Sequence, residues 1–228
     1  MKTMKGRKSE KQFTRLLAFL LAYLFLTPFI PQNSWTTVIV QIWLSVTLLF
    51  AASVAQNKKK HRTLIVVLVL VAVCLHWLGI YEVLPFSGEG ALFLFVVFYA
   101  LLIHAFGKRL IRARHVTGEV IMVALCIYLV IGLLWGAGYA LMDALSGGTA
   151  FGGTLLENVQ TSKLHLYNYF SMVTLTTLGY GDITPQIPEA ASLCQMEAII
   201  GQFFTAVLVA WLVGMYGKPM GRQQPEQE

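Results

Sequence analysis

The fold of this 228-residue chain is decided by residues 164–182, which read LHLYNYFSMVTLTTLGYGD. Residues 164–175 are apolar and would form roughly 18 Å of helix, whereas a helix that crosses a bilayer needs about 20 residues. This segment lies between two longer apolar runs, so it is predicted to be a helix that enters a membrane and stops partway. Because non-helical backbone at membrane depth is tolerated only inside protein or beside a water-filled cavity, residues 176–182 are predicted to line an aqueous path.

The composition of the whole chain places it in a membrane. Hydrophobic residues make up 57% of it and charged residues only 12%, against about 25% charged residues in soluble domains. These proportions exclude a soluble globular domain, a disordered chain and a collagen. Six apolar runs are predicted to cross the bilayer, at approximately residues 16–31, 35–55, 63–80, 90–106, 116–141 and 190–217. The predicted fold is an all-α membrane protein with six transmembrane helices and one re-entrant helix.

The net charge of +6 reflects the orientation of these spans in the membrane. Basic residues form four groups, and the polar breaks that alternate with them hold acids instead. The groups are Lys2, Lys5, Arg7, Lys8, Lys11 and Arg15; Lys58, Lys59, Lys60 and Arg62; Lys108, Arg109, Arg112 and Arg114; and Lys218 with Arg222. By the positive-inside rule all four groups are cytoplasmic, so both termini are predicted to be cytoplasmic in a multi-pass protein of the plasma membrane. The excess charge is topological, and no nucleic-acid partner is predicted.

The spacing of the apolar runs divides the chain into two regions. Turn-like connections at residues 31–34, 56–62 and 82–90 join the first four runs, which are therefore predicted to pack as a compact bundle. A much longer interval, residues 142–189, separates the last two runs. It begins with a Gly-rich part at residues 146–153, which is predicted to be flexible and to lie outside the cell.

The sequence after the half-helix closely resembles the selectivity filter of potassium channels, whose signature is usually written T-V-G-Y-G. Here it reads Thr-Thr-Leu-Gly-Tyr-Gly-Asp over residues 176–182. In such a filter, successive backbone carbonyls replace the water around a potassium ion. The backbone then needs unusual dihedral angles at alternate positions, which Gly179 and Gly181 can adopt because they lack a side chain.

This resemblance implies a role for each residue of the loop. The residues expected to bind K+ through the filter are Thr177, Leu178, Gly179, Tyr180 and Gly181, with the Thr177 hydroxyl as the innermost ligand. The residues expected to support the filter are Thr174, Thr176 and Asp182. The C-terminal end of the half-helix, which carries partial negative charge, is expected to point toward the cavity that holds the dehydrated cation.

One such loop supplies only a quarter of a ring of ligands. A single copy of the motif therefore implies a homotetramer with fourfold symmetry around the ion path. The resemblance covers residues 116–217, and it divides the chain into five parts. These are a basic cytoplasmic N-terminus at 1–15, a four-helix transmembrane bundle at 16–106, a basic linker at 107–115, the pore domain at 116–217 and a short cytoplasmic tail at 218–228.

The last apolar run resembles the inner helix of bacterial potassium channels. Gly201 lies twenty residues after Gly181, where such channels have a gating hinge; the alternative is a small residue that allows close helix contact. A second group, Gln202, Thr205 and Val209, shares one helical face and is predicted to line the inner cavity. Glu197 is an acid within an apolar helix, for which structural hydrogen bonding and pH sensing both remain open.

Two positions depart from the family pattern near the filter. Val173 stands where several potassium channels have an acid that pairs with the aspartate after the filter, so Asp182 is predicted to lack that partner. Phe170 stands where relatives often have a tryptophan, and a phenyl ring cannot donate a hydrogen bond to Tyr180. Thr174 is expected to hold the Tyr180 hydroxyl instead. These departures predict a filter whose inactivation differs from that of such relatives.

The layout resembles that of voltage-gated channels, but the gating charges are missing. Residues 91–106 read ALFLFVVFYALLIHAF, without an Arg or Lys at every third position. Such charges make channel opening steeply voltage-dependent. Arg109 and Arg112 follow this run and are read as part of the linker. Voltage dependence is therefore predicted to be weak or absent.

Together these features predict a potassium-selective channel that conducts K+ passively and is not an enzyme. Apart from the permeant K+ ions, no cofactor is expected. The partners are other copies of the chain and membrane lipids; the basic N-terminus either binds anionic lipid or serves only as a topology signal. The alternatives are a nonselective cation channel, a potassium transporter or uptake subunit, and a subunit that assembles only with other channel subunits.

Overall fold

The computed structural model describes residues 2–29, 34–55, 59–80, 86–113, 115–157 and 163–216. Several predicted features lie outside these described residues. They are residues 31–33, 56–58 and 82–85 of the turns expected at 31–34, 56–62 and 82–90, the linker residue Arg114, and the cytoplasmic tail at 218–228 with its two basic residues.

The described chain is almost entirely helical, which confirms the all-α prediction. The elements are α1 (Lys2–Leu26), the 3-10 helix η1 (Thr27–Phe29), α2 (Ser34–Ala55), α3 (Lys59–Ile80), α4 (Ser87–Ile111), α5 (Gly118–Leu145), β1 (Phe151–Gly152), α6 (Thr154–Glu157), α7 (Leu164–Leu175), β2 (Thr184–Pro185) and α8 (Pro188–Tyr216). The half-helix predicted at residues 164–175 coincides with α7. The two short strands pair antiparallel, with Phe151 opposite Pro185.

Several helices run beyond the limits that their apolar runs suggested. Helix α1 begins at Lys2, so the predicted N-terminal segment and the first apolar run form one helix. Residues 59–62 and 87–90, expected to be turns, are the first turns of α3 and α4, and residues 107–111 of the predicted linker end α4. Hydropathy marks only the part of a helix that prefers lipid, whereas Lys, Arg and Glu are good helix formers that extend it.

Among the described residues, three helices are long and apolar enough to cross a membrane, as expected of a membrane protein. They are Ser87–Ile111, Gly118–Leu145 and Pro188–Gly214. Two further helices contain shorter apolar stretches, at Val38–Val54 and Ile65–Gly79. Six membrane crossings therefore remain a prediction.

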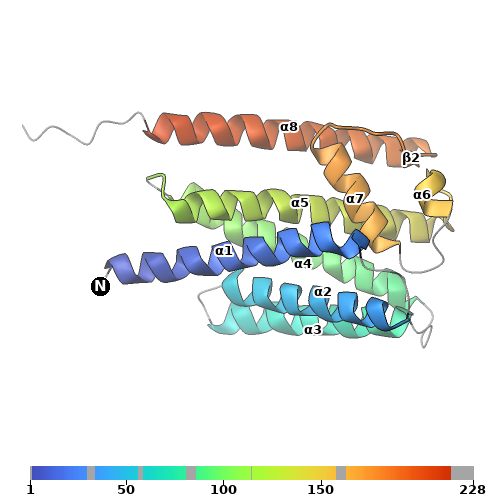
Figure 1. Ribbon diagram of the computed structural model, residues 1–228, viewed down its shortest axis with the longest axis horizontal. Helices are drawn as coiled ribbons and strands as arrows, with labels where there is room; N and C mark the ends of the chain where they lie inside the picture. The colour runs from blue at the N-terminus through green and yellow to red at the C-terminus, as the bar shows by residue number, and fades with distance from the viewer. Residues whose placement is uncertain are drawn as a thin grey trace, which may run out of the picture.

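The long helices lie side by side, and α7 crosses between them at an angle (Figure 1). Helix α5 is central, because it packs against α1, α4, α7 and α8. Helices α2 and α3 pack on each other and against α4, on the far side of the molecule from α8. The start of α1, the junction of α4 with α5 and the end of α8 all lie at one end of the bundle (Figure 1).

Small residues on α5 let α7 come close. Gly132 and Gly136 are four residues apart and so lie on one face of the helix. A Cβ at Gly136 would lie 2.9 Å from the backbone Cα of Asn168, and one at Gly132 would overlap the side chain of Met172. This G-x-x-x-G pattern is the usual device for close approach of two membrane helices, and it sets the position of α7.

Asp143 organises the loop that precedes α7. Its Oδ1 accepts the backbone N–H groups of Ala150 at 3.1 Å and Phe151 at 3.3 Å, and its Oδ2 accepts the Tyr167 hydroxyl at 2.5 Å. The Gly-rich segment predicted to be flexible is thus an ordered turn tied to both α5 and α7. Gly147 and Gly148, with φ of 65° and 80°, provide the left-handed conformation that this turn requires.

The contact between α5 and α7 predicts that two glycine substitutions in α5 will change thermal stability differently. Gly136→Ala should lower the free energy of unfolding by about 1–3 kcal/mol because its methyl group meets the backbone of α7. Gly138→Ala is the matched control, since a Cβ there has no atom within 4 Å, and it should be neutral or stabilising by up to about 1 kcal/mol. Thermal unfolding of both variants in detergent measures the difference, and equal midpoints would contradict the packing described.

Candidate ion-conducting site

The filter segment begins as the C-terminal cap of α7. The N–H of Thr177 donates to the Thr174 carbonyl at 2.9 Å, and the N–H of Leu178 donates to the Val173 carbonyl at 2.9 Å. This pair of bonds is the Schellman pattern that ends many helices, and it requires a left-handed residue at the position of Thr177. Thr177 has a φ of 58°. The pore-type helix and the loop after it are therefore joined by fixed backbone bonds.

Left-handed backbone recurs at every second residue of this loop. Thr177, Gly179 and Gly181 have φ of 58°, 61° and 77°. The conformations predicted for the two glycines are confirmed, whereas the one at Thr177 was not expected. A positive φ is a genuine outlier for a β-branched residue, and such strained residues cluster at functional sites.

The carbonyl oxygens of residues 177–180 remain available for a ligand. Within the described part of the chain, no hydrogen-bond donor reaches any of them. Residues 176–181 are all exposed in the single subunit, with Tyr180 66% exposed. Carbonyl oxygens that no protein donor engages are free to coordinate a cation.

Several potassium channels have an acid at the position of Val173 that pairs with the aspartate after the filter. Here Asp182 has a different hydrogen-bond partner. The Tyr169 hydroxyl donates to its Oδ2 at 2.5 Å, and the N–H of Ile183 donates to its Oδ1 at 3.1 Å. The outer end of the loop is thereby tied to α7 through Asp182, which the sequence singled out, and Tyr169, which it did not.

The other predicted supports of the loop are arranged differently from expectation. The Thr174 hydroxyl makes no hydrogen bond to Tyr180 within the described residues; Thr174 acts through its carbonyl, which caps the helix. The Thr176 hydroxyl donates to the Met172 carbonyl at 2.7 Å. Phe170 packs against the rings of Tyr139 and Phe151.

Glu197 joins three helices behind the loop. Its side chain is fully buried, its Oε2 accepts the Tyr139 hydroxyl of α5 at 2.5 Å, and its Oε1 lies 2.5 Å from the Ser171 hydroxyl of α7. Ser171 Oγ also lies 2.7 Å from the Gly132 carbonyl. Glu197 makes no ion pair within the described residues. These contacts favour the hydrogen-bonding role over pH sensing.

Gly201 lies where α8 touches the end of α7. A Cβ at this position would collide with the carbonyl oxygen of Leu175 and would lie 2.9 Å from the Leu175 side chain. The contact favours the close-packing role of Gly201 in this conformation, and its role as a hinge remains a prediction.

The face of α8 predicted to line a cavity is open in the single subunit. Gln202, Thr205 and Val209 are all exposed, and the Thr205 hydroxyl bonds only to its own helix, at the Gly201 and Gln202 carbonyls. Nothing in the described part of the chain covers this face. Within the described residues, the loop carbonyls therefore accept no hydrogen bond, and the adjacent face of α8 is covered by no other helix.

The basic residues after the fourth apolar run fix a helix junction. Arg109 Nη1 lies 3.5 Å from Glu119 Oε1 on α5 and 3.1 Å from Ser9 Oγ on α1, and its guanidinium lies over the Phe13 ring. Ser9 also donates to Glu119. Arg109 thus holds α1, α4 and α5 together at one end of the bundle, which is a structural role unlike that of a gating charge.

Residues 120–218 match the family model described as Ion channel. This segment is therefore similar to ion channel domains; it overlaps the predicted pore domain and contains both the loop and α8. The match favours the prediction that the chain is not an enzyme.

A curated relative, the "Two pore potassium channel a" of Oryza sativa subsp. japonica, is 30% identical over 103 residues. The aligned part is 45% of this chain and 26% of the relative, so the chain spans about a quarter of that protein's length. No solved structure matches the chain. The family and the relative confirm the predicted resemblance to the potassium channel family.

The bond between Tyr169 and Asp182 predicts a specific change in sustained ionic current. Tyr169→Phe removes a hydrogen bond to a charged group, worth about 1.5–3 kcal/mol, so the current should decay about tenfold faster during long openings. Tyr167→Phe is the matched control, because it breaks an equally short phenol–carboxylate bond at Asp143, away from the loop. Equal decay in the two variants would show that the Asp182 bond does not hold the loop.

The network at Glu197 predicts that shape and hydrogen bonding matter there more than charge. Glu197→Gln retains an acceptor for Tyr139 and a donor for Ser171, so thermal stability and current should stay close to those of the unmodified chain. Glu197→Ala leaves the Tyr139 hydroxyl without its carboxylate partner beside a cavity and should cost about 2–5 kcal/mol, whereas Ser171 keeps the Gly132 carbonyl. A Gln variant as unstable as the Ala variant would mean that an ionised carboxylate is required.

Proposed function

We propose that this chain assembles as a homotetrameric, potassium-selective channel that conducts K+ passively across the plasma membrane. The observation that carries the proposal is the loop of residues 177–180. Its four carbonyls accept no hydrogen bond within the described residues, and every second residue from Thr177 has a left-handed backbone conformation. Alternation of left-handed and right-handed residues turns successive carbonyls toward the same side of the chain. A column of such oxygens can replace the hydration shell of a cation.

Assembly of four copies completes this site. One loop supplies one side of each oxygen ring, and fourfold symmetry supplies the other three. The single subunit supports this, because α8 is the least buried of the described helices that are long and apolar enough to cross a membrane. Several large side chains there are more than half exposed, namely Ile199, Phe203, Val207, Val209 and Val213. Four α8 helices around a common axis would cover part of this surface and bring Gln202, Thr205 and Val209 to the cavity.

Selectivity for potassium is supported by the completeness of the loop. Gly179, Tyr180 and Gly181 are all present, and the bonds from Val173 and Thr174 fix the base of the loop while Tyr169 fixes Asp182. A transporter would usually contain four degraded loops in one chain, whereas this chain has one intact loop.

Gating is proposed to be only weakly voltage-dependent. The described part of α4 carries its basic residues in the last turn, where Arg109 is engaged with Glu119 and Ser9. A charge that stabilises a helix junction cannot easily move through the membrane field. The basic residues at this end are proposed to be cytoplasmic, with both termini on the same side.

Bilayer recording from the purified chain, with potassium on one side and sodium on the other, tests this function. The expected result is a unitary current that reverses near the potassium equilibrium potential and depends weakly on voltage. A reversal potential that ignores the potassium gradient would establish a nonselective channel. Flux far below the rate of ion diffusion would establish a transporter, and absence of current from the chain alone would establish a subunit that needs another partner.

A Gly179 variant tests whether potassium selectivity depends on the left-handed backbone conformation of the loop. Gly179→Ala places a methyl group on a residue with a φ of 61°, which costs about 1–2 kcal/mol per subunit. It should abolish or strongly reduce potassium selectivity. Gly214→Ala is the control, because a Cβ there meets no atom within 4 Å, and its reversal potential should be unchanged.

A further inference from the structure

The four-helix bundle packs against α5 and reaches α7 in this chain. Near the start of α5, a Cβ at Gly118 would lie 3.1 Å from the carboxyl carbon of Glu10 on α1. Two turns further along, the Cys126 thiol donates to the Phe13 carbonyl at 3.7 Å. Beyond that contact, α1, α5 and α7 share one cavity, whose lining includes Tyr23, Tyr128 and Tyr169.

The same contacts could form in two ways in a tetramer. If the bundles were exchanged between neighbours, the same side chains would meet, but each pair would come from two copies of the chain. The connection between α4 and α5 distinguishes the two arrangements, because it belongs to one chain in both.

The connection between α4 and α5 is short, and both of its ends serve as helix caps. Only residues 112–117 separate the two helices, and fully extended they would span at most about 25 Å. The N–H of Ala113 donates to the Leu110 carbonyl at 3.1 Å, which closes the end of α4. The Thr117 hydroxyl accepts the N–H of Val120 at 3.4 Å, which caps the start of α5.

An exchanged bundle would stretch this connection to its limit. Arg109 in the last turn of α4 lies 3.5 Å from Glu119 in the first turn of α5. An exchanged α4 would therefore end beside the neighbour's α5, and its chain would have to return to its own. In a fourfold ring of α8 helices with α5 one layer further out, neighbouring α5 helices lie at least roughly 20–25 Å apart, because packed helices are about 8–10 Å apart. Covering that distance would require an extended connection without its caps.

We propose that in the assembled channel each four-helix bundle packs against the pore domain of its own subunit and not against that of a neighbour. This inference rests on the proposed fourfold assembly. The surface that binds the bundle is the face of α5 with Glu119 and Cys126, which are seven residues apart and so lie on one side of the helix. Its partner is the pair of helices α1 and α4 of the same chain.

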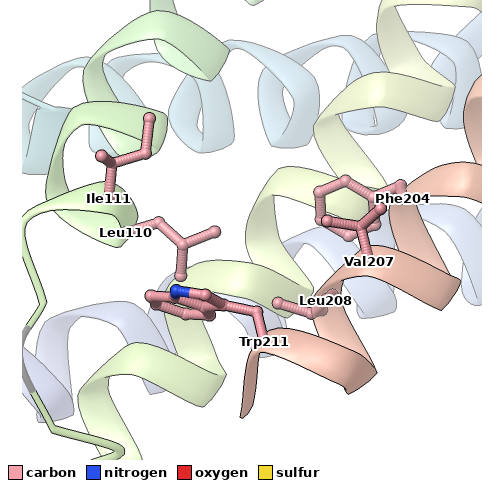
Figure 2. Close-up of a pocket in the computed structure, with 6 residues that line it drawn as sticks. All are labelled: Leu110, Ile111, Phe204, Val207, Leu208 and Trp211. Atoms are coloured by element: carbon pink, nitrogen blue, oxygen red, sulfur yellow. The ribbon is translucent and has the colours of Figure 1, made fainter. Parts of the chain in front are cut away.

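This arrangement places the end of α4 beside the α8 of the same chain. Figure 2 shows Leu110 and Ile111 of α4 facing α8 across a gap, with the Trp211 ring reaching toward Leu110. The gap is an apolar groove of about 260 Å³, lined on the α8 side by Phe204, Val207, Leu208 and Trp211. A displacement of the bundle would therefore reach the part of α8 beyond Gly201 in its own subunit.

Disulfide trapping in the full chain tests this arrangement. Glu10→Cys with Gly118→Cys, in a background without the three native cysteines, places two thiols where α1 meets α5. The pair of Arg109 with Glu119 stays intact in this variant. Oxidation of the purified tetramer should form the bond within one chain, so a denaturing gel should show a monomer with both thiols consumed. Dimers and larger products would overturn the proposal, and so would two thiols that remain free.

Mixed assembly is the matched control for the origin of the bond. Copies with Glu10→Cys alone are co-expressed with copies with Gly118→Cys alone and purified together through two different tags. These mixed tetramers should give no dimer, and a dimer would show that the bundles are exchanged. Lys11→Cys with Gly118→Cys should also stay unlinked, because Lys11 is exposed and turned roughly 100° around α1 from Glu10. Linking of this pair as readily as the first would overturn the contact on which the inference depends.

Bilayer recording of the reduced Glu10→Cys, Gly118→Cys variant distinguishes this inference from the proposed function. An exchanged bundle would change the products on the gel but leave the potassium current in place. Loss of the potassium current from the unmodified chain would instead contradict the proposed function, whatever the gel shows.

Discussion

The rest of the structure depends on two backbone hydrogen bonds at the end of α7, from Thr177 to Thr174 and from Leu178 to Val173. These bonds use the last carbonyls of the helix, so the chain leaves it through a left-handed Thr177 and in a fixed direction. The carbonyls that follow, at residues 177–180, then have no donor of their own within the described chain. A strained turn thus converts the end of an ordinary helix into a row of available oxygens. The strain is small per residue, but it persists because the surroundings hold both ends of the loop.

Those surroundings are a set of polar contacts buried among apolar helices. Asp143 ties the segment before α7 to α5, Tyr169 ties Asp182 to α7, and Glu197 joins α8 to both helices. Each contact uses a carboxylate and a hydroxyl, groups that are costly to leave unpaired away from water. The loop is therefore held by a connected scaffold of α5, α7 and α8, while the cavity-facing half of α8 below Gly201 has few internal contacts.

The sequence was most informative where a local rule applies. The length and apolar pattern of residues 164–175 predicted α7 to the residue, and the glycine positions predicted the left-handed backbone at Gly179 and Gly181. Thr177 was missed because the rule assigns positive φ to glycine, and only the helix cap explains the exception. The G-x-x-x-G pattern at Gly132 and Gly136 was present in the sequence and could have predicted the packing of α7.

Contacts between distant residues could not be predicted in this way. The partners of Glu197 are Ser171 and Tyr139, which are 26 and 58 residues away, and no periodicity connects such positions. The same holds for Tyr169 and Asp182, because their pairing depends on how the chain turns between them. Helix ends were also misjudged, since hydropathy reports the preference for lipid and not the extent of hydrogen bonding. The predicted six crossings and fourfold assembly involve the membrane and other subunits, which a single chain does not contain.

The central claim, that backbone carbonyls of four copies form a row of cation sites, is tested most directly by anomalous diffraction from crystals of the full chain grown in rubidium. The claim predicts a line of anomalous peaks on a fourfold axis, between successive rings of the carbonyl oxygens of residues 177–180. Peaks absent from that axis, or copies arranged without fourfold symmetry around the loop, would contradict it.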